Sequence, residues 1–294
     1  MTDALDEGRK RRIPLGEPFS DVALGFREWG PAAPVRTVVC VHGLTRNAAD
    51  FAALGTGLAA RGARVLAVDV VGRGESSWLA DPAGYTVPTY AAQLTRWLEL
   101  LGLEGVDWVG TSMGGLVGMV LAAGEAPPMA RLVLNDIGPF VPRTALAEIG
   151  RYLELEPHFA SVREAEAHLR TIHAGFGPLT DAQWRRLTET SLVPAGDGWR
   201  LHYDPAIRVP YADLAETDLD LWAVYDRIDR PTLVLHGADS PLLDAATCAA
   251  MAGRGPRAEI RSFAGVGHAP ALLDDAQIET DRKSTRLNSS HYRT

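Results

Sequence analysis

Lysine is almost missing from this chain, since Lys10 and Lys283 are the only two among 294 residues. Cysteine is equally scarce: Cys40 and Cys248 lack a CxxC partner, so we expect no disulfide between them. No apolar run approaches the ~18 residues that a membrane span needs. The first 15 residues are polar and basic, without the apolar segment typical of a signal peptide. We therefore expect a cytoplasmic protein.

An excess of positive charge is also absent, because the formal net charge is −8 at pH 7. This balance argues against binding to nucleic acid or to an anionic membrane. Hydrophobic residues make up 46% and charged residues 22% of the chain, which is ordinary for a globular protein with a sizeable core. We expect an enzyme that acts on a small-molecule substrate as a monomer or homodimer.

Short apolar runs alternate with helical segments through most of the chain. Several runs are apolar at nearly every position, as is typical of strands buried on both faces of a parallel sheet. The alternation predicts an α/β fold with a mostly parallel, doubly wound sheet. The expected strands are Val22–Trp29, Arg36–Val41, Arg64–Val68, Val106–Val109, Arg131–Leu134, Thr232–Leu235 and Glu259–Phe263, and the expected helices are Ala48–Ala60, Tyr90–Leu101, Met113–Ala123 and Leu243–Ala252.

The alternation stops after Leu134 and resumes at Pro231. Residues 138–230 between these points have a mostly helical pattern. Because predicted sheet strands flank this stretch on both sides, we interpret it as a helical cap inserted into the fold. Residues 1–137 and 231–280 would then form one core domain.

The final residues, 281–294, read DRKSTRLNSSHYRT and contain one of the two lysines. They show no apolar periodicity and no strand pattern. The segment resembles translated vector or sequencing-adaptor sequence, so we interpret it as a non-native, disordered tail.

A nucleophile elbow is predicted around Ser112. Residues 110–114 read Gly-Thr-Ser-Met-Gly, a G-x-S-x-G pattern that carries little weight alone because glycine and serine are common. Here it follows the apolar run 106–109 and opens the helical run 113–123, which is the strand–turn–helix setting of an elbow. The glycines permit a sharp turn that exposes the serine hydroxyl. Ser112 is therefore the candidate nucleophile.

Two backbone N–H groups are candidates for binding an oxyanion. His42 follows a predicted strand, and ligands of parallel sheets gather at the carboxyl ends of the strands. We expect the N–H groups of Leu44 and Met113 to act as the donors. His42 should pack and orient its loop without titrating, and Asp69 should hold its own loop through hydrogen bonds to backbone N–H groups.

His268 is the candidate general base. It lies in a glycine-flanked loop just after the last predicted strand, from which it can reach Ser112. The other histidines lack such a setting. None of them occurs in HExxH or another metal-ligand spacing, so we predict no metal.

The motifs VHGLTRN, DVVGRGESS, GTSMGG, LVLNDIGP and GVGHAP resemble those of the α/β-hydrolase superfamily in order and spacing. Within it, the chain from about Val22 to Ile278 resembles small bacterial carboxylesterases and their relatives that hydrolyse carbon–carbon bonds. The resemblance implies an α/β-hydrolase fold, a serine nucleophile and no cofactor. One departure is Val71, where such relatives often carry arginine.

Three carboxylates are candidates for the acid that pairs with His268. The family usually places its acid three residues after a glycine that ends the penultimate strand. Here that position is Ser240, and Asp239 comes one residue early. Asp136 is the alternative, because some relatives place their acid after the strand that precedes the cap. Asp244 is expected to cap the next helix, and we prefer Asp239.

Together these parts predict a serine hydrolase that cleaves carboxylic esters of small to medium size through an acyl-enzyme. One alternative is a carbon–carbon bond hydrolase acting on β-diketones or ring-cleavage products. Another is a non-catalytic binding protein of the same fold, although the presence of both Ser112 and His268 favours catalysis. The aromatic residues available in the cap to line an apolar pocket are Phe159, Phe176, Trp184, Trp199 and Tyr203.

Overall fold

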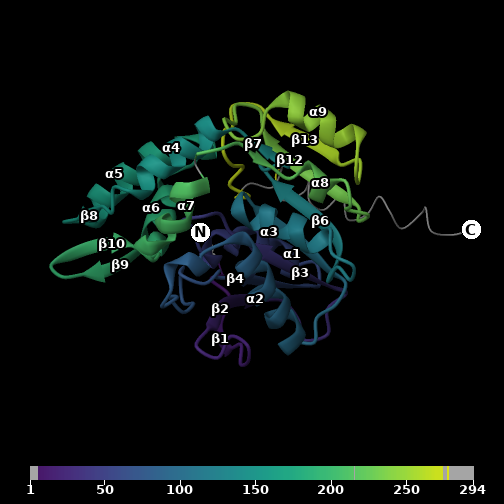
Figure 1. Cartoon of the computed structure of the whole chain (residues 1–294). Coiled ribbons are helices and arrows are strands. Elements are labelled where there is room, and N and C mark those ends of the chain that lie inside the picture. Colours follow the sequence, from purple (N-terminus) through teal and green to yellow (C-terminus); the bar gives the residue numbers. More distant parts are fainter. Residues whose placement is uncertain (1–5, 215, 274–276, 278–294) are drawn as a thin grey trace, which may run out of the picture.

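A computed structural model describes residues 6–214, 216–273 and 277, so the expected tail at 281–294 lies outside the described residues. The main sheet consists of β1 (Arg9–Pro14), β2 (Ala23–Trp29), β3 (Arg36–Val41), β4 (Ala63–Val68), β5 (Val106–Thr111), β6 (Met129–Asn135), β12 (Thr232–Gly237) and β13 (Glu259–Phe263). Their order in space is β1-β2-β4-β3-β5-β6-β12-β13 (Figure 1). The pairings of β2 with β1 and β4 are antiparallel, and the others are parallel. The predicted, mostly parallel α/β sheet is confirmed.

Alternating side chains of the central strands enter two separate cores. On β3, Val39 and Val41 face one core, while Val38 and Cys40 face the other. The first core is closed by α2 (Val87–Leu100), α3 (Met113–Ala122) and α9 (Ala245–Gly253), and the second by α1 (Ala52–Ala59). Burial on both faces explains why these strands are apolar at nearly every position. Within the described residues, no helix is long and apolar enough to cross a membrane.

Residues 138–230 connect β6 to β12 and contain both helices and short strands. In Figure 1 the part of this segment from α4 to β10 extends to the left of the main sheet. Its elements are β7 (Phe140–Val141), α4 (Arg143–Leu153), β8 (His158–Phe159), α5 (Val162–Ile172), η3 (Ala174–Phe176), α6 (Asp181–Ser191), β9 (Leu192–Ala195), β10 (Gly198–Leu201), η4 (Pro205–Ile207), α7 (Arg208–Leu214), β11 (Leu219–Asp220) and α8 (Trp222–Tyr225). A small antiparallel sheet of order β8-β10-β9 therefore accompanies the helices that the sequence predicted.

The edge strand β1 was not predicted, because it reads Arg-Lys-Arg-Arg-Ile-Pro and has little apolar character. Two of its basic side chains are held by one acidic residue on the neighbouring strand, and Lys10 pairs with Glu75 in a loop. Arg9 and Arg11 donate to the carboxylate of Glu28 at 2.6 and 3.1 Å, and Arg64 of β4 donates to it at 2.7 Å. Charged residues on an edge strand also discourage pairing with another chain.

Glu28 should make the stability of this edge depend on pH. Burial alone would raise the pKa of this carboxyl, but hydrogen bonds from the three arginines outweigh it and lower the pKa from 4.5 to about 2. A carboxyl with a depressed folded pKa stabilises the fold above its unfolded pKa, and this contribution is lost as the pH falls through the folded value. Because the arginines are partly exposed, Glu28→Gln should lower the free energy of unfolding at neutral pH by about 1 kcal/mol.

Urea unfolding of the parent and the Glu28→Gln variant checks this expectation. The difference between the two proteins should be largest at neutral pH and should shrink between about pH 4.5 and pH 2, as the parent's carboxyl takes up its proton. A difference that stays constant over this range would contradict the assignment.

Candidate active site

Ser112 stands at a sharp turn between β5 and α3. Its backbone angles are φ 51° and ψ −116°, a region that strains a residue with a side chain. The flanking glycines are required by close packing. A Cβ at Gly110 would lie 2.3 Å from the carbonyl oxygen of Gly114, and a Cβ at Gly114 would lie 2.1 Å from that of Val41. The turn therefore has the geometry expected of an elbow, with Ser112 immediately before the N-terminus of α3.

His268 lies between Ser112 and a carboxylate. Its Nε2 is 3.0 Å from the Oγ of Ser112, and its Nδ1 is 2.8 Å from the Oδ2 of Asp136. An ionised carboxylate can only accept, so Nδ1 carries the proton that points to Asp136. Nε2 is then free to accept the hydrogen of the serine hydroxyl. The structure thus brings both predicted residues, Ser112 and His268, into one hydrogen-bonded chain.

The carboxylate in this chain belongs to Asp136, the alternative candidate, and not to Asp239, which we preferred from the sequence. Asp136 directly follows β6, which pairs with β5 on one side and β12 on the other, and its side chain is completely buried. Asp239 lies in the turn after β12, where it is exposed and donates its backbone N–H to the carbonyl oxygen of Val266 at 2.9 Å. The strand that a carboxylate follows therefore matters more than its spacing in sequence from a glycine in deciding which carboxylate reaches His268.

Ser240 occupies the position where the family usually carries its acid, and it supports Asp136. Its hydroxyl donates to Oδ2 of Asp136 at 2.6 Å, while the N–H of Gly237 donates to Oδ1 at 2.8 Å. With His268, the buried carboxylate therefore accepts three hydrogen bonds, which satisfy its charge and fix its orientation. Sequence reasoning identified Ser240 only as the residue that stands in place of the usual acid, and it did not foresee that the hydroxyl supports Asp136.

The loops beside the serine are held as the sequence predicted. His42 accepts the N–H of Val70 at 2.9 Å through Nε2, and its Nδ1 lies 2.7 Å from the carbonyl oxygen of Gly43. Burial lowers the pKa of His42 to about 3, so its ring stays neutral and orients the loop. Asp69 accepts two backbone N–H groups at 2.7 and 3.0 Å, and Asp244 caps α9.

Leu44 and Met113 present their backbone beside the serine. Both residues line the same cavity as Ser112, and a Cβ placed on the neighbouring Gly43 would lie 3.6 Å from the Cβ of Ser112. Among the hydrogen bonds of the described residues, neither the Leu44 nor the Met113 N–H donates to a protein acceptor. Both groups are therefore available to a ligand at the serine.

Ser112 lines two cavities of different character. One, of about 320 Å³, is apolar and is bounded by α2, α3 and residues of the segment 138–230. The other, of about 410 Å³, has a mixed lining that contains His268 and more polar side chains than the first, and we call it the polar cavity. Ser112, Leu44, Ile149 and Leu242 line both. Residues that line the apolar side alone include Met113, Val120, Leu146, Ile207, Tyr211 and Leu219, and those on the polar side alone include Thr45, Arg46, Glu148, Tyr152, His173 and Asp239.

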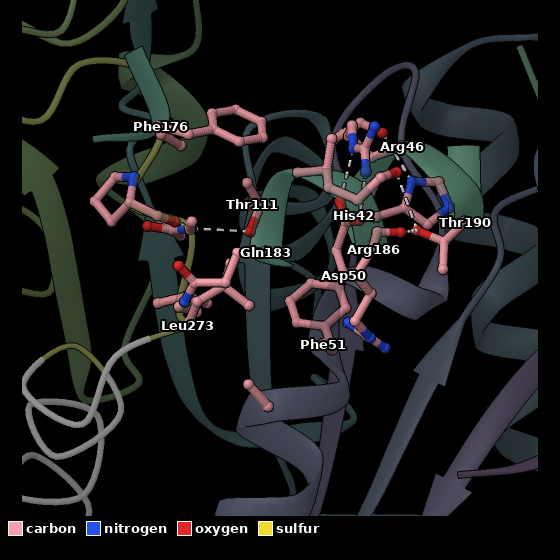
Figure 2. A pocket seen from close by; sticks show the side chains of 18 residues that line it. His42, Arg46, Asp50, Phe51, Thr111, Phe176, Gln183, Arg186, Thr190 and Leu273 are labelled. Atoms are coloured by element: carbon pink, nitrogen blue, oxygen red, sulfur yellow. Dashed lines mark hydrogen bonds and ion pairs between the residues drawn. The ribbon is translucent and has the colours of Figure 1, made fainter. Parts of the chain in front are cut away.

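A third cavity, of about 230 Å³, lies next to the polar one (Figure 2). Arg46 and Phe176 line both of these cavities. Figure 2 shows Arg46 beside Asp50, to which it donates two hydrogen bonds of 2.8 and 2.6 Å. Neither Ser112 nor His268 is among the residues that line this space, so it is a neighbour of the candidate site and not part of it.

Most of the aromatic residues that were available to line the pocket pack elsewhere in the structure. Phe159 and Trp199 pack in one small core of the segment 138–230, and Trp184 packs in a second. Tyr203 belongs to the core that α2, α3 and α9 close on one face of the main sheet. Phe176 does line a cavity, on the polar side. The segment instead contributes mainly aliphatic side chains to the apolar cavity. Among the described residues, no group of three or more His, Cys, Asp or Glu side chains is placed to hold a metal ion.

A mostly parallel sheet with a serine at the β5–α3 turn, and with an aspartate and a histidine converging on it, defines a hydrolase of the α/β class. The family model described as "alpha/beta hydrolase fold" matches residues 36–164. Over 264 residues the chain is 42% identical to the 3-hydroxybutyrate-oligomer hydrolase of Cupriavidus necator, covering 87% of this chain and 90% of that one. The chain belongs to the α/β-hydrolase family.

Solved structures agree with this assignment. A putative hydrolase from Rickettsia typhi superimposes with a TM-score of 0.89 at 30% identity, covering 96% of this chain and 100% of that one. An α/β hydrolase from Novosphingobium aromaticivorans gives a TM-score of 0.83 at 33% identity, covering 96% and 99%. The similarity spans the sheet and also the segment 138–230, since nearly the whole chain is covered.

Proposed function

We propose that this hydrolase is a serine carboxylesterase that cleaves esters of small to medium size through an acyl-enzyme. The observation that carries the proposal is the hydrogen-bonded chain from Asp136 through His268 to Ser112, with distances of 2.8 and 3.0 Å. A nucleophile, a base in contact with it and a buried group that orients the base are the parts that acyl transfer requires.

The reaction follows from these contacts. His268 takes the proton of Ser112 as the serine oxygen attacks the ester carbonyl. The N–H groups of Leu44 and Met113 bind the oxyanion of the tetrahedral intermediate. His268 then gives its proton to the departing alcohol, and a water molecule activated by the same imidazole hydrolyses the acyl-enzyme. Asp136 keeps the imidazole in the productive tautomer and stabilises the imidazolium.

The two cavities suggest how the substrate lies. Because His268 must protonate the leaving alcohol, the alcohol portion has to occupy the polar cavity, which His268 lines. The acyl portion then extends from Ser112 into the apolar cavity on the other side. The preferred substrate is accordingly an ester with an apolar acyl group of limited length and a more polar alcohol portion.

Residues 138–230 act in this proposal as a cap on a core formed by residues 1–137 and 231–280. Leu146 and Tyr211 of this segment line the apolar cavity, while Tyr152 and His173 line the polar one. A segment that lines both sides of the serine can shape the substrate and exclude water.

The activity of the Cupriavidus necator relative offers a substrate class. Oligomers of 3-hydroxybutyrate are linear esters in which the departing alcohol carries a carboxyl function. Such a polar alcohol portion matches the cavity lined by Arg46, Tyr152 and His173. We propose short hydroxy-acid oligoesters as substrates beside simple esters, and the 3-hydroxybutyrate dimer is the first to test.

Narrowing each cavity separately tests the orientation of the substrate. Val120 lines the apolar cavity and Ile172 lines the polar one. Val120→Phe should reduce kcat/KM more as the acyl chain of p-nitrophenyl esters lengthens from acetate to decanoate, by about 10- to 200-fold at the long end. Ile172→Phe should leave this acyl profile unchanged and should instead discriminate against bulky alcohols in a series of butyrate esters.

The two variants serve as matched controls for each other, because each adds the same side chain to one wall. Folding is checked by circular dichroism, and a serine-directed phosphonate should still label Ser112 in both. If Ile172→Phe changed the acyl profile and Val120→Phe changed the alcohol profile, the substrate would lie the other way round. Cleavage of a β-diketone in preference to every ester would favour the carbon–carbon hydrolase instead.

A further inference from the structure

Arg73 is a completely buried arginine in the loop after β4. Burying a charged side chain costs several kcal/mol unless a partner compensates for the lost hydration. In the part of the chain that the structure describes, no carboxylate lies within ion-pair distance of Arg73. The buried carboxylate of Asp204 is engaged elsewhere, by the hydroxyl of Tyr85 at 2.5 Å and the N–H of Ala206 at 2.9 Å. A buried cation without an anionic partner calls for an explanation.

The contacts of Arg73 converge on the two residues that carry the oxyanion donors. Its Nε donates to the carbonyl oxygen of Leu44 at 2.8 Å, and its Nη2 lies 3.7 Å from the Sδ of Met113. Its Nη1 is held by the carbonyl oxygen of Val71 and the hydroxyl of Tyr90, at 2.8 and 2.9 Å. The guanidinium is also close to an aromatic ring, with its carbon 5.1 Å from the ring centre of Tyr90.

We infer that Arg73 is a positioning residue of the oxyanion hole, which holds Leu44 and Met113 in register so that their N–H groups converge on one point. This inference rests on the proposed esterase function. Leu44 belongs to the loop after β3 and Met113 to the start of α3, and Arg73 bridges these two separate segments. Because the fork of a guanidinium is planar and rigid, it can hold several partners in a fixed geometry, whereas the three donors of an ammonium group rotate on a flexible stem.

The positive charge of Arg73 also favours the oxyanion. The guanidinium directly contacts each donor residue, in a site that side chains shield from water. A fixed positive charge in such surroundings stabilises negative charge that develops nearby in the transition state, and it needs no reorganisation to do so. An anionic partner would cancel this effect, so the missing carboxylate is consistent with the function.

The test compares Arg73→Met and Arg73→Lys with the parent on p-nitrophenyl butyrate and on its thionoester, in which sulfur replaces the carbonyl oxygen. Sulfur accepts hydrogen bonds weakly, so the thionoester gains less from the oxyanion donors. Arg73→Met should lower kcat on the oxygen ester by about 100-fold, the scale of losing one oxyanion donor, with little change in KM. The ratio of oxygen-ester to thionoester rates should fall by about tenfold, since the donors no longer converge.

Arg73→Lys keeps the charge and much of the volume but offers a single ammonium group. It should fold and lose about tenfold in kcat, with a smaller fall in the rate ratio. Arg36→Met is the matched control, because Arg36 begins β3, contacts Asp107 at 3.3 Å and is absent from the residues that line the cavities beside Ser112. It should leave both kcat and the rate ratio within about twofold of the parent.

Each outcome decides something. A folded Arg73→Met or Arg73→Lys with the parent's kcat and rate ratio overturns the inference, and so does a fall in kcat with an unchanged ratio, which would be a general structural effect. If Arg73→Met does not fold, the kcat and the rate ratio of Arg73→Lys provide the test. A parent that neither hydrolyses esters nor is labelled at Ser112 would refute the proposed function and this inference together. An active parent whose Arg73 variants keep the same kcat and rate ratio would refute the inference alone.

Discussion

Replacing Ser112 with alanine should abolish ester hydrolysis, lowering kcat by about 10⁴-fold or more, because the members of such a triad act as a unit. The reason is geometric. His268 has its Nε2 3.0 Å from the serine oxygen and would be left without a nucleophile to activate. What remains is the slow attack of water on the bound ester, assisted only by substrate binding and by the oxyanion donors. Steady-state kinetics on p-nitrophenyl butyrate measures the loss.

Covalent labelling supplies the matching evidence. A phosphonate or sulfonyl fluoride should modify Ser112 in the parent and nothing in Ser112→Ala. Ser262→Ala is a suitable control, since Ser262 lies on β13 with its hydroxyl 2.9 Å from His236 and lines none of the cavities beside Ser112. It should keep full activity and full labelling. More than a tenth of the parent's activity in a folded Ser112→Ala would remove Ser112 from the mechanism.

Asp136→Asn should lower kcat by about 10⁴-fold, whereas Asp239→Asn should stay near the parent. The carboxylate of Asp136 accepts the Nδ1 proton of His268 at 2.8 Å. An amide at this place can donate to Nδ1 instead, which would shift the proton to Nε2 and prevent the ring from accepting the proton of Ser112. Asp239 is exposed and has no contact of this kind.

This pair of variants is a matched comparison, because both remove one charge with the same isosteric change. Circular dichroism should show both folded, and the loss in Asp136→Asn should appear in kcat more than in KM. Retention of activity in Asp136→Asn together with its collapse in Asp239→Asn would show that the catalytic acid comes from the turn after β12, contrary to the hydrogen bonds described above.

Local patterns predicted the sheet and the elbow because each feature constrains a short run of neighbouring residues. The run at 106–109 is largely apolar because β5 is buried on both faces. Glycine is required at 110 and 114 because a Cβ there would meet the carbonyl oxygen of Gly114 or of Val41. Edge strand β1 escaped prediction for the opposite reason. Its residues are charged, and the carboxylates that compensate them are distant in sequence, as Glu28 is from Arg9.

The carboxylate that contacts His268 and the lining of the pocket could not be predicted from local patterns. Asp136 and Asp239 follow adjacent strands, and the choice between them depends on how each turn directs its side chain in three dimensions. Likewise, aromatic character indicates that Phe159 or Trp184 is buried, but it does not say which core encloses the residue. Arg73 shows the same limit, because an arginine in a glycine-rich loop gives no sign that it is buried.

The bond from the N–H of Gly237 to Asp136 joins two residues that are 101 positions apart, since Asp136 directly follows β6 and Gly237 ends β12. Everything between them, including the segment 138–230, is a closed loop whose ends are joined at the carboxylate of Asp136. Lengthening such a loop costs little, about 0.6 kcal/mol for each doubling of its length. Evolution can therefore exchange, extend or trim this insertion to reach new substrates, while Ser112, His268 and Asp136 keep their positions relative to the sheet.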